Sequence, residues 1–478
     1  MRPRVIDLHS APKVPLFDSE LIKKYSGNGP RYTSYPTAAQ FDSHYTSDDY
    51  IIAAQRSNEL IIPSDLSLYV HIPFCDTICY YCACNKIVTK NRARAEKYLD
   101  YLIRELHMHA ELYDGDRRVV QLHFGGGTPT FLSDVQFKRI MREIDSAFTL
   151  TCGSDRDFSI EIDPRSVTPS RIGQLADLGF NRFSLGVQDI DLNVQRAINR
   201  IQPLVQTHAI VDACRKSNAS SINIDLIYGL PRQTETTFSQ TLQMVTHELR
   251  PDRLSVFNYA HMPERFKTQR QIDELDLPGP DQKLRILEQV ITTLTDAGYI
   301  HIGMDHFALP KDALCSALND HTLHRNFQGY TTHSKCDLIG LGVSAIGKVG
   351  SDFYQNEKRL DDYYSALDRT SDHNSAFAIE RGLKMSDEDL VRAEIIQELS
   401  CYFSFSPIDV ESRFGINFKQ SFAWEVDQLE KLSKDGLVEH EHGEWRVTAK
   451  GRLLIRNICA VFDEYQQPAT SSGFSRLI

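Results

Sequence analysis

The segment Tyr69-Val-His-Ile-Pro-Phe-Cys75-Asp-Thr-Ile-Cys79-Tyr-Tyr-Cys82-Ala-Cys84-Asn holds four cysteines within ten positions. The first three follow the spacing C-x3-C-x2-C, directly after a β-rich run at 67–72. Three thiolates on a loop that leaves a strand can bind three irons of a [4Fe–4S] cubane and leave the fourth iron without a protein ligand. A small molecule can bind an iron that is open in this way. The segment therefore predicts a catalytic cluster held by Cys75, Cys79 and Cys82.

A structural zinc site is the alternative for the same segment, with Cys84 as its fourth ligand. Zinc sites of that kind usually combine two pairs of ligands that lie far apart in the sequence. The remaining cysteines are instead scattered singly, and we interpret them as buried or unreactive thiols; they are Cys152, Cys214, Cys315, Cys336, Cys401 and Cys459. This distribution is typical of metal ligands in a reducing compartment rather than of a disulfide framework.

Outward from the cysteines, the chain repeats a β-rich run, a polar turn and a helical stretch. The further β-rich runs are at 119–124, 158–162, 182–187, 221–227 and 253–257. Six such units predict an α/β fold in which crossover helices connect parallel strands, namely a partial (β/α)6 barrel. Residues 94–111 and 281–297 have the apolar spacing of amphipathic helices. Chemistry in such barrels occurs at the carboxyl ends of the strands, which is where the motifs lie.

Changes of pattern along the chain predict three domains. Residues 1–66, with a helical stretch at 47–59, are expected to form an N-terminal extension that closes over the active site. Residues 67–375 are expected to form the barrel and the substrate-binding region. Residues 376–478 predict a small, mainly helical domain whose hairpin around Gly443 resembles that of a winged helix. Many acidic residues occur there, which disfavours DNA binding because phosphate neutralisation needs clustered Lys and Arg.

The overall composition restricts the class of protein. Of 478 residues, 41% are hydrophobic and 24% are charged, as in a globular protein with a sizeable core. The net charge of −11 disfavours general attraction to nucleic acid or to an anionic membrane surface. The N-terminal residues lack the apolar stretch of a secretory signal, and no segment approaches the roughly 20 apolar residues of a membrane span. We therefore predict a cytoplasmic protein that has neither membrane nor nucleic acid as a partner.

Longer stretches of sequence carry a resemblance. The cysteine spacing after a strand resembles that of the radical S-adenosylmethionine (SAM) superfamily. Ten stretches between about residues 31 and 347 are similar to the oxygen-independent coproporphyrinogen III oxidases, namely RYTSYPTA, LYVHIPFC, CACNKI, HFGGGTPT, SLGVQD, NIDLIYGLP, FNYAH, GMDHFALP, HRNFQGYTT and GLGVSAIG. A shared cysteine motif would not account for similarity over that length. The resemblance therefore implies a radical SAM barrel.

The resemblance also implies a reaction. SAM would chelate the open iron, and an electron from the cluster would cleave it to a 5′-deoxyadenosyl radical. That radical would begin the oxidative decarboxylation of two propionates of coproporphyrinogen III to vinyl groups, giving protoporphyrinogen IX in heme biosynthesis without O₂. The reaction needs a reducing electron donor for the cluster and a final electron acceptor, neither of which the sequence identifies. No apolar stripe indicates a subunit interface, which is compatible with a monomer.

The resemblance implies two SAM molecules and assigns residues to them. The first SAM would contact Tyr69, Gly126, Glu161 and Ile346, the second would contact Gly127, Thr128, Gln188, Arg200, Asp225 and Ala260, and Tyr81 would stack on an adenine where the family commonly has Phe.

Some of these positions also stand out by pattern, because glycines after a strand let the backbone approach a ligand. Strict alternation directs Ser159, Glu161 and Asp163, and likewise Asn223 and Asp225, toward the barrel interior. An ion pair with an arginine is the alternative for Glu161. Ordinary surface or packing positions are the alternative for Arg200 and Ala260.

Cys84 is not needed as a cluster ligand. It is either a spare packing thiol or, as the resemblance implies, a catalytic residue, since the related heme-chaperone branch typically lacks it. The main alternative function is accordingly a heme-binding chaperone on the same fold without oxidase activity, and a radical SAM enzyme acting on another tetrapyrrole is a further one. Arg31 and Arg325 are hypothesised to bind substrate carboxylates through bidentate pairs. His333 stands where the family usually has Gln near the substrate.

Overall fold

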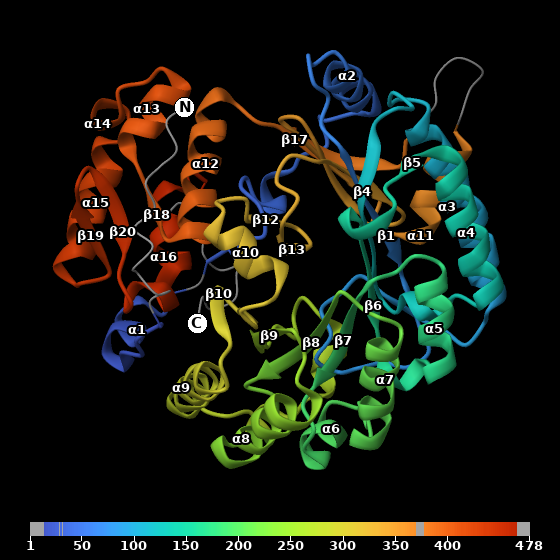
Figure 1. Ribbon diagram of the computed structural model, residues 1–478, viewed down its shortest axis with the longest axis horizontal. Helices are drawn as coiled ribbons and strands as arrows, with labels where there is room; N and C mark the ends of the chain where they lie inside the picture. The colour runs from blue at the N-terminus through green and yellow to red at the C-terminus, as the bar shows by residue number, and fades with distance from the viewer. Residues whose placement is uncertain (1–13, 28, 31, 370–376, 466–478) are drawn as a thin grey trace. The chain divides into compact units, whose positions relative to one another are not determined.

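The computed structural model describes residues 14–27, 29–30, 32–369 and 377–465 (Figure 1). Interleaved segments of the chain form two compact units. The barrel unit comprises Pro36–Gly279 and His333–Leu390, and the terminal unit comprises Met1–Tyr35, Pro280–Thr332 and Val391–Ile478. These divisions differ from the boundaries expected at 66 and 375, so the three domains, with residues 1–66 as a cover of the active site, stay a prediction.

Six parallel strands form the centre of the barrel unit, as the sequence predicted. Each strand pairs in parallel with the next along the sheet. Side chains that alternate toward the covered face are almost completely buried, as for Ile160 and Ile162, whereas Ser159 and Glu161 between them are only partly buried. In chain order the strands are β1 (Leu66–Ile72), β4 (Arg118–Gly126), β6 (Asp157–Ile162), β7 (Arg182–Gln188), β8 (Ser221–Tyr228) and β9 (Arg253–Asn258).

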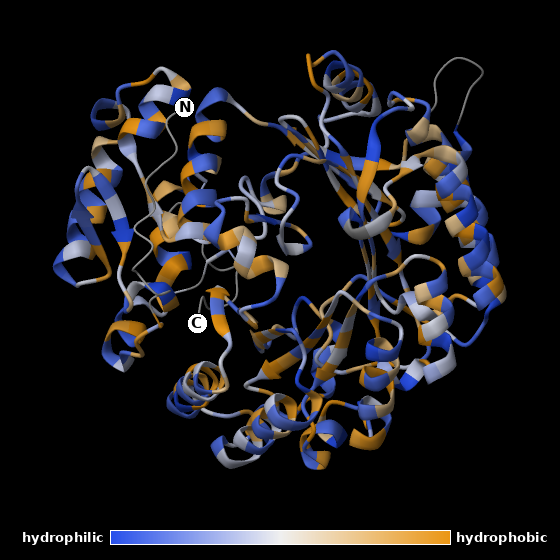
Figure 2. Cartoon of the chain, in the orientation of Figure 1, coloured by the Kyte–Doolittle hydropathy of each residue, from blue (hydrophilic) through white to orange (hydrophobic). Residues whose placement is uncertain are grey.

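Helices connect these strands and cover one face of the sheet (Figure 1). Several begin at a side-chain cap, as at Ser133 and Thr234, whose hydroxyls accept backbone N–H bonds from the first turn. Apolar residues on their inner side are buried, and Figure 2 shows them interspersed with polar residues along each helix. The helices are α3 (Ala93–Ala110), α4 (Asp134–Ala147), α5 (Pro169–Asp177), α6 (Leu192–Ala197), α7 (Leu204–Lys216) and α8 (Glu235–Met244).

The sheet extends beyond the six predicted strands. β14 (Asp337–Leu341) pairs in parallel with β1 on the side opposite β4. Three antiparallel strands follow, which the sequence patterns did not predict: β15 (Ile346–Val349), β16 (Asp352–Asn356) and β17 (Ile379–Lys384). The barrel unit also contains α2 (Ser47–Asn58), which confirms the helix expected at 47–59, α11 (Leu360–Asp368) and the short β5 (Thr149–Leu150).

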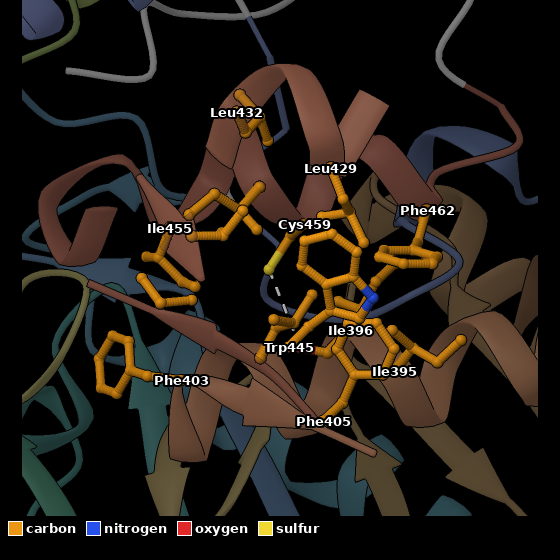
Figure 3. Packing of buried hydrophobic residues seen from close by; sticks show 14 of the residues in the cluster. Ile395, Ile396, Phe403, Phe405, Leu429, Leu432, Trp445, Ile455, Cys459 and Phe462 are labelled. Carbon is orange, nitrogen blue, oxygen red and sulfur yellow. Dashed lines mark hydrogen bonds between the residues drawn. The ribbon is translucent and has the colours of Figure 1, made fainter. Parts of the chain in front are cut away.

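The terminal unit is mainly helical and has its own hydrophobic core (Figure 3). Ile395, Phe405, Leu429, Trp445 and Phe462 pack there, each 5% exposed or less. The hairpin predicted around Gly443 is confirmed. Its strands β19 (Val438–Glu441) and β20 (Glu444–Val447) pair antiparallel, and β18 (Ser404–Phe405) joins them.

The other elements of the terminal unit come from all three of its segments. They are α1 (Ser19–Tyr25), α9 (Pro280–Asp296), β10 (Ile300–Gly303), β11 (His306–Ala308), α10 (Ala313–Asn319), β12 (His324–Asn326), β13 (Gly329–Thr331), α12 (Asp387–Tyr402), whose first turn belongs to the barrel unit, α13 (Pro407–Phe414), α14 (Phe418–Ser421), α15 (Ala423–Lys434) and α16 (Ile455–Cys459). Among the described residues, no helix combines the length and the apolar character required to cross a membrane.

Helix α1 is bound to residues more than 400 positions later in the chain. Lys24 Nζ lies 2.6 Å from Asp435 Oδ2, and Lys450 Nζ lies 3.0 Å from Asp18 Oδ2. Asn457 donates a hydrogen bond of 2.9 Å to the carbonyl of Tyr25. These contacts make α1 part of the terminal unit rather than a separate arm.

Candidate active site

The cysteine loop is closed at its base by two short parallel strands. β2 (Phe74–Cys75) follows β1 almost directly and pairs with β3 (Ile87–Val88). The N–H of Ile87 donates to the carbonyl of Pro73 over 2.7 Å, and that of Thr89 donates to Cys75 over 2.9 Å. The intervening residues are thereby held as a loop at the carboxyl end of β1, where the barrel rule places chemistry.

Each thiol of the predicted ligand set has a polar neighbour. Thr128 Oγ1 lies 3.4 Å from Cys75 Sγ. Cys79 Sγ lies 3.4 Å from Arg165 Nη2 and 3.6 Å from Arg200 Nη1. A guanidinium or hydroxyl donor stabilises negative charge on sulfur.

Cys82 differs from the other two because a second cysteine lies beside it. The thiol of Cys84 donates to Cys82, which lowers the pKa of Cys82 to about 6, and the charge of Lys86 acts in the same direction. Burial raises the pKa of Cys75 to about 11. Cys84 itself is exposed to solvent.

A cubane and a single zinc ion make different demands on the geometry of these cysteines. Four ligands of a structural zinc site must converge on a single point. The three thiolates of a cubane bind three different irons and need no such convergence.

Glu161 and Tyr69, assigned by resemblance to the first SAM, both contact His123. Glu161 Oε2 accepts the N–H of Gly126 over 3.1 Å, and Oε1 lies 3.4 Å from His123 Nε2. The ring of His123 stacks on Tyr69 with centroids 5.7 Å apart. Burial opposes ionisation of Glu161, but the bonds from His123 and Gly126 prevail and lower its pKa below the usual value. The basic partner of Glu161 is thus a histidine, not the arginine of the alternative interpretation.

Backbone geometry explains the glycines after β4. Gly126 has φ +116°, and a Cβ atom there would lie 2.7 Å from His71 Cε1. A Cβ atom at Gly127 would lie 2.6 Å from the carbonyl oxygen of Pro73. Any larger residue would displace the strand end or the cysteine loop.

Ile346, the last residue assigned to the first SAM, is near the same group. Tyr69 pairs with Gly340 across the β1–β14 ladder. A Cβ atom at Gly340 would lie 2.5 Å from the carbonyl oxygen of Ile346. The β14–β15 turn therefore returns Ile346 to the position beside Gly340.

The residues assigned to the second SAM line the neighbouring strand ends. Gln188, at φ +70°, ends β7 after an irregularity in the ladder. Arg200 Nη2 donates to Gly186 O over 2.5 Å and Nη1 to Asp163 Oδ2 over 3.0 Å. Gln269 donates to the carbonyls of Tyr81 and Ala260 over 3.0 and 3.2 Å, which joins the cysteine loop to the segment after β9.

Asp225 is a partly buried carboxylate on the inner face of β8. It accepts hydrogen bonds from Asn223 Nδ2 at 2.8 Å and Ser184 Oγ at 3.3 Å. Burial, and then the charge of Glu161, raises its pKa to about 6. Asp225 is therefore an ionised carboxylate at neutral pH that is held at a cost in stability.

Comparison with known proteins identifies the family of the chain. A model of the radical SAM superfamily matches residues 69–245, and a model of the HemN C-terminal domain matches residues 385–454. The oxygen-independent coproporphyrinogen III oxidase of Pseudomonas aeruginosa is 49% identical and covers 97% of this chain and 99% of its own length. The corresponding protein of Escherichia coli K12 is 46% identical over 97% of this chain and 98% of its own length. The chain belongs to the oxygen-independent coproporphyrinogen III oxidases.

A solved structure of a family member supports the same fold. Coproporphyrinogen III oxidase (HemN) from Escherichia coli, a radical SAM enzyme, has a TM-score of 0.88 and 45% sequence identity with this chain, and the match covers 95% of this chain and 100% of that one. As an oxygen-independent coproporphyrinogen III oxidase, the chain is a radical SAM enzyme, and a [4Fe–4S] cluster and SAM are its cofactors. The predicted fold class and family are confirmed, and the chaperone alternative is not favoured.

Sequence reasoning missed four residues of this oxidase site: His123, Arg165, Lys86 and Gln269. Strand alternation could have found His123, because it shares the inner face of β4 with Gln121 while Leu122 and Phe124 are buried. The other three lie on loops or a short 3-10 helix, where no periodic pattern indicates direction.

Of the expectations about substrate contacts, the one for His333 changes, whereas those for Arg31 and Arg325 stay predictions. His333 Nε2 lies 3.9 Å from Asp157 Oδ2, at the amino end of β6, whereas Glu161 lies toward the carboxyl end. Its position therefore does not support the expectation that it lies near the substrate. Arg31 lies outside the described residues. Arg325 lies in the terminal unit, 7% exposed, with Nε donating to the carbonyl of Tyr32 over 3.0 Å.

Proposed function

We propose that this chain catalyses the oxygen-independent conversion of coproporphyrinogen III to protoporphyrinogen IX, with Cys75, Cys79 and Cys82 as the ligands of its [4Fe–4S] cluster. The observation that carries the proposal is the closed cysteine loop, whose thiols face Thr128, Arg165 and Lys86. When bound, the cluster and SAM supply a 5′-deoxyadenosyl radical that removes hydrogen from a substrate propionate.

The proposed site of the first SAM comprises Tyr69, Gly126, Glu161 and Ile346. Glu161 is held ionised by His123 and Gly126, so it can accept a hydrogen bond from an ammonium or hydroxyl group. The missing side chain of Gly126 allows the ring of His71 to pack against its backbone beside Glu161. These residues bind and orient the cofactor, and they leave the radical chemistry to it.

A second SAM is proposed beside the first. Its proposed contacts are Gly127, Thr128, Gln188, Arg200, Asp225 and Ala260, with Tyr81 as the surface for an adenine. Arg200 and Asp225 offer one cationic and one anionic group to a zwitterionic ligand. Tyr81 packs against the apolar cluster that contains Ile198 and Tyr259, which supports its ring as a rigid stacking surface.

Cys84 is the proposed catalytic cysteine. It lies beside Cys82 and is exposed, whereas Cys79 is buried. We expect Cys75→Ser to lower bound iron and to abolish the visible absorbance of the cluster. Cys84→Ser should keep both and lose turnover, whereas a Cys84→Ser protein without iron would contradict the assignment.

The decisive experiment reconstitutes the cluster without oxygen. SAM, a reductant and coproporphyrinogen III are added, and protoporphyrinogen and 5′-deoxyadenosine are measured, with Cys75→Ala as the control. Formation of both products only by the parent protein is expected. Binding of heme without either product would instead support the chaperone.

The redox partners follow from the reaction. We propose a one-electron reductant for the cluster and a separate acceptor for the electron that the substrate loses. A monomer stays a prediction.

We also propose a cytoplasmic location. It rests on the cysteine usage, because exposed thiols such as Cys84 and Cys152 persist in a reducing compartment.

A further inference from the structure

Arg325, which lies over the ring of Tyr330 on β13, and two further arginines lie close to the β10–β11 hairpin and β13 in the terminal unit. The guanidinium of Arg325 lies 4.8 Å from the centre of the Tyr330 ring. The ring centre of His306 lies 5.2 Å from that of Tyr330. The preceding residue, Asp305, forms an ion pair with Arg456.

The third arginine approaches through two aromatic side chains. The guanidinium of Arg452 lies 3.9 Å from the centre of the Phe403 ring. Phe403 in turn lies 6.1 Å from the ring of His301 on β10. His301 lies on β10, and Asp305 lies in the turn between β10 and β11. Arg452 and Arg456 therefore approach the same hairpin. After burial, the charge of Arg452 also lowers the pKa of His301.

The three arginines of this cluster differ in whether a carboxylate lies beside them. Arg456 has Asp305 as its partner. Burial lowers the pKa of His301 to about 4, so it is neutral, and burial lowers the pKa of Arg452 only to about 10, so it remains charged. Two guanidinium groups, those of Arg325 and Arg452, thus lack a carboxylate among the residues that the structure describes.

Some N–H donors of Arg325 and Arg452 also lack an acceptor among the described residues. Arg325 uses Nε on the carbonyl of Tyr32, but its Nη1 is buried and has no acceptor within the described part of the chain. The Nε and Nη1 atoms of Arg452 are both buried without an acceptor there. Buried cations and donors are costly unless an anion or an acceptor satisfies them. Three buried N–H groups on these two arginines therefore have no acceptor among the described residues.

We propose that Arg325 and Arg452 form a binding site for a carboxylate group of a ligand. Guanidinium forks match the planar geometry of a carboxylate through paired N–H bonds. If the proposed function holds, this group is a propionate of coproporphyrinogen III, and the two arginines bind and orient the substrate without taking part in the chemistry. Arg325 is a substrate-binding candidate from the sequence, whereas no sequence motif indicates Arg452.

The binding test uses coproporphyrin III, the fluorescent oxidised form, which does not react. Its dissociation constant is measured for the full-length parent protein, Arg325→Met and Arg452→Met, with Arg446→Met as the matched control. Arg446 lies in the same unit but is exposed and pairs with Glu444. We expect each cluster variant to bind about tenfold more weakly or worse, since charge-assisted bonds are lost, and the control to bind as the parent does.

A second ligand separates carboxylate recognition from general packing. The tetramethyl ester of coproporphyrin III has no charged carboxylate, so the parent protein and Arg452→Met should bind it equally. Thermal unfolding provides a further readout. Removing an unpaired buried cation should leave the melting temperature of the ligand-free protein unchanged or raise it, whereas a structural arginine would lower it.

The outcomes distinguish the two proposals. In the oxidase assay, Arg452→Met should raise KM for coproporphyrinogen III with little change in kcat. A parent protein that forms no protoporphyrinogen would refute the proposed function. A parent that forms it, together with unchanged coproporphyrin III binding by Arg325→Met and Arg452→Met, would refute only the carboxylate site. If Arg452→Met does not fold, Arg452→Lys, which keeps the charge but loses the fork, replaces it and should show an intermediate loss.

Discussion

Arg165 joins two parts of the site that the sequence keeps far apart. Its Nη2 lies 3.4 Å from Cys79 Sγ, and the same guanidinium binds Asp163 over 2.7 to 3.2 Å. Asp163 also binds Arg200, so one carboxylate orients both donors to Cys79. Hydrogen bonds to cluster thiolates favour the more electron-rich, reduced state.

We therefore expect Arg165→Met to lower the reduction potential of the reconstituted cluster, on the order of tens of millivolts. The measurement is a redox titration followed by electron paramagnetic resonance, without SAM. Arg139→Met, which removes an ion pair to Glu96 and Asp100 on the helical surface, serves as the control and should leave the potential unchanged. A potential of Arg165→Met equal to that of the parent would show that the contact has no electrostatic effect on the cluster.

The raised pKa of Asp225 predicts how the stability of the protein depends on pH. Its pKa in the folded chain, about 6, is above the usual 3.8. Between these values the folded state binds more protons than the unfolded state, so stability falls as pH rises from about 4 to about 6. At neutral pH the ionised carboxylate costs about 3 kcal/mol. Asp225→Asn should thus match the parent near pH 4 and unfold at a higher temperature near pH 7.

Thermal unfolding of the ligand-free protein across this pH range checks the expectation. The exposed Asp177→Asn provides the baseline for loss of a carboxylate. A constant difference between Asp225→Asn and the parent from pH 4 to pH 7 would contradict the raised pKa.

The sequence could predict residues whose direction follows from their neighbours in the chain. It could not predict residues whose role depends on contacts with distant positions. Alternation along β6 and β8 directed Glu161 and Asp225 to the open face, and the burial of Ile160 and Ile224 confirms it. The contact between Arg165 and Cys79 joins positions 86 residues apart, one on a short 3-10 helix after β6 and one on the cysteine loop. No local period encodes such a contact, because it depends on how neighbouring strands bring their loops together.

At the scale of elements, Glu105 connects helix α3 to the turn that precedes β15. This fully buried carboxylate accepts hydrogen bonds from Gly342 N–H, Asn356 Nδ2 and Tyr363 O–H over 2.7, 2.6 and 2.7 Å. The turn that begins at Gly342 leads to Ile346, a proposed neighbour of SAM. Packing of a crossover helix thus determines the position of a proposed cofactor contact.

Glu105→Leu should destabilise the protein by about 3 kcal/mol or more, because three buried donors lose their acceptor. Glu105→Gln keeps one carbonyl oxygen and should cost less. Urea unfolding followed by far-ultraviolet circular dichroism measures both. Equal loss for the two variants would mean that shape, rather than hydrogen bonding, accounts for the effect.

Among the elements, the six parallel strands and the helices at 47–59, 94–111 and 281–297 were predictable because each has a clear period. β15 to β17 were not. Gly340, Gly342 and Gly347 interrupt any alternation there, and their lack of side chains serves close approach of Ile346, His71 and Tyr354 rather than a strand pattern. Tertiary packing, which a single sequence does not display, selects those strands.

At the scale of the whole molecule, both tryptophans of the chain, Trp424 and Trp445, lie in the terminal unit. Their fluorescence therefore reports that unit, and the cluster absorbance reports the barrel unit. Deleting residues 1–26 removes α1 and its buried Ile22, which is 2% exposed and worth about 2 kcal/mol. We expect the urea midpoint from tryptophan fluorescence to fall while the cluster absorbance at zero urea stays the same. An unchanged fluorescence midpoint would contradict the role of α1 in the terminal unit.

The attachment of α1 also has a consequence for synthesis on the ribosome. Lys24 and its partner Asp435 are 411 residues apart. At about 5 to 20 residues per second, translation separates their appearance by roughly 20 to 80 s. Neighbouring strands such as β1 and β4 emerge within seconds of each other. For most of translation, Ile22 and the apolar side of α1 therefore have no partner, so we expect chaperones that bind nascent chains to protect this helix until the final residues of the terminal unit leave the exit tunnel.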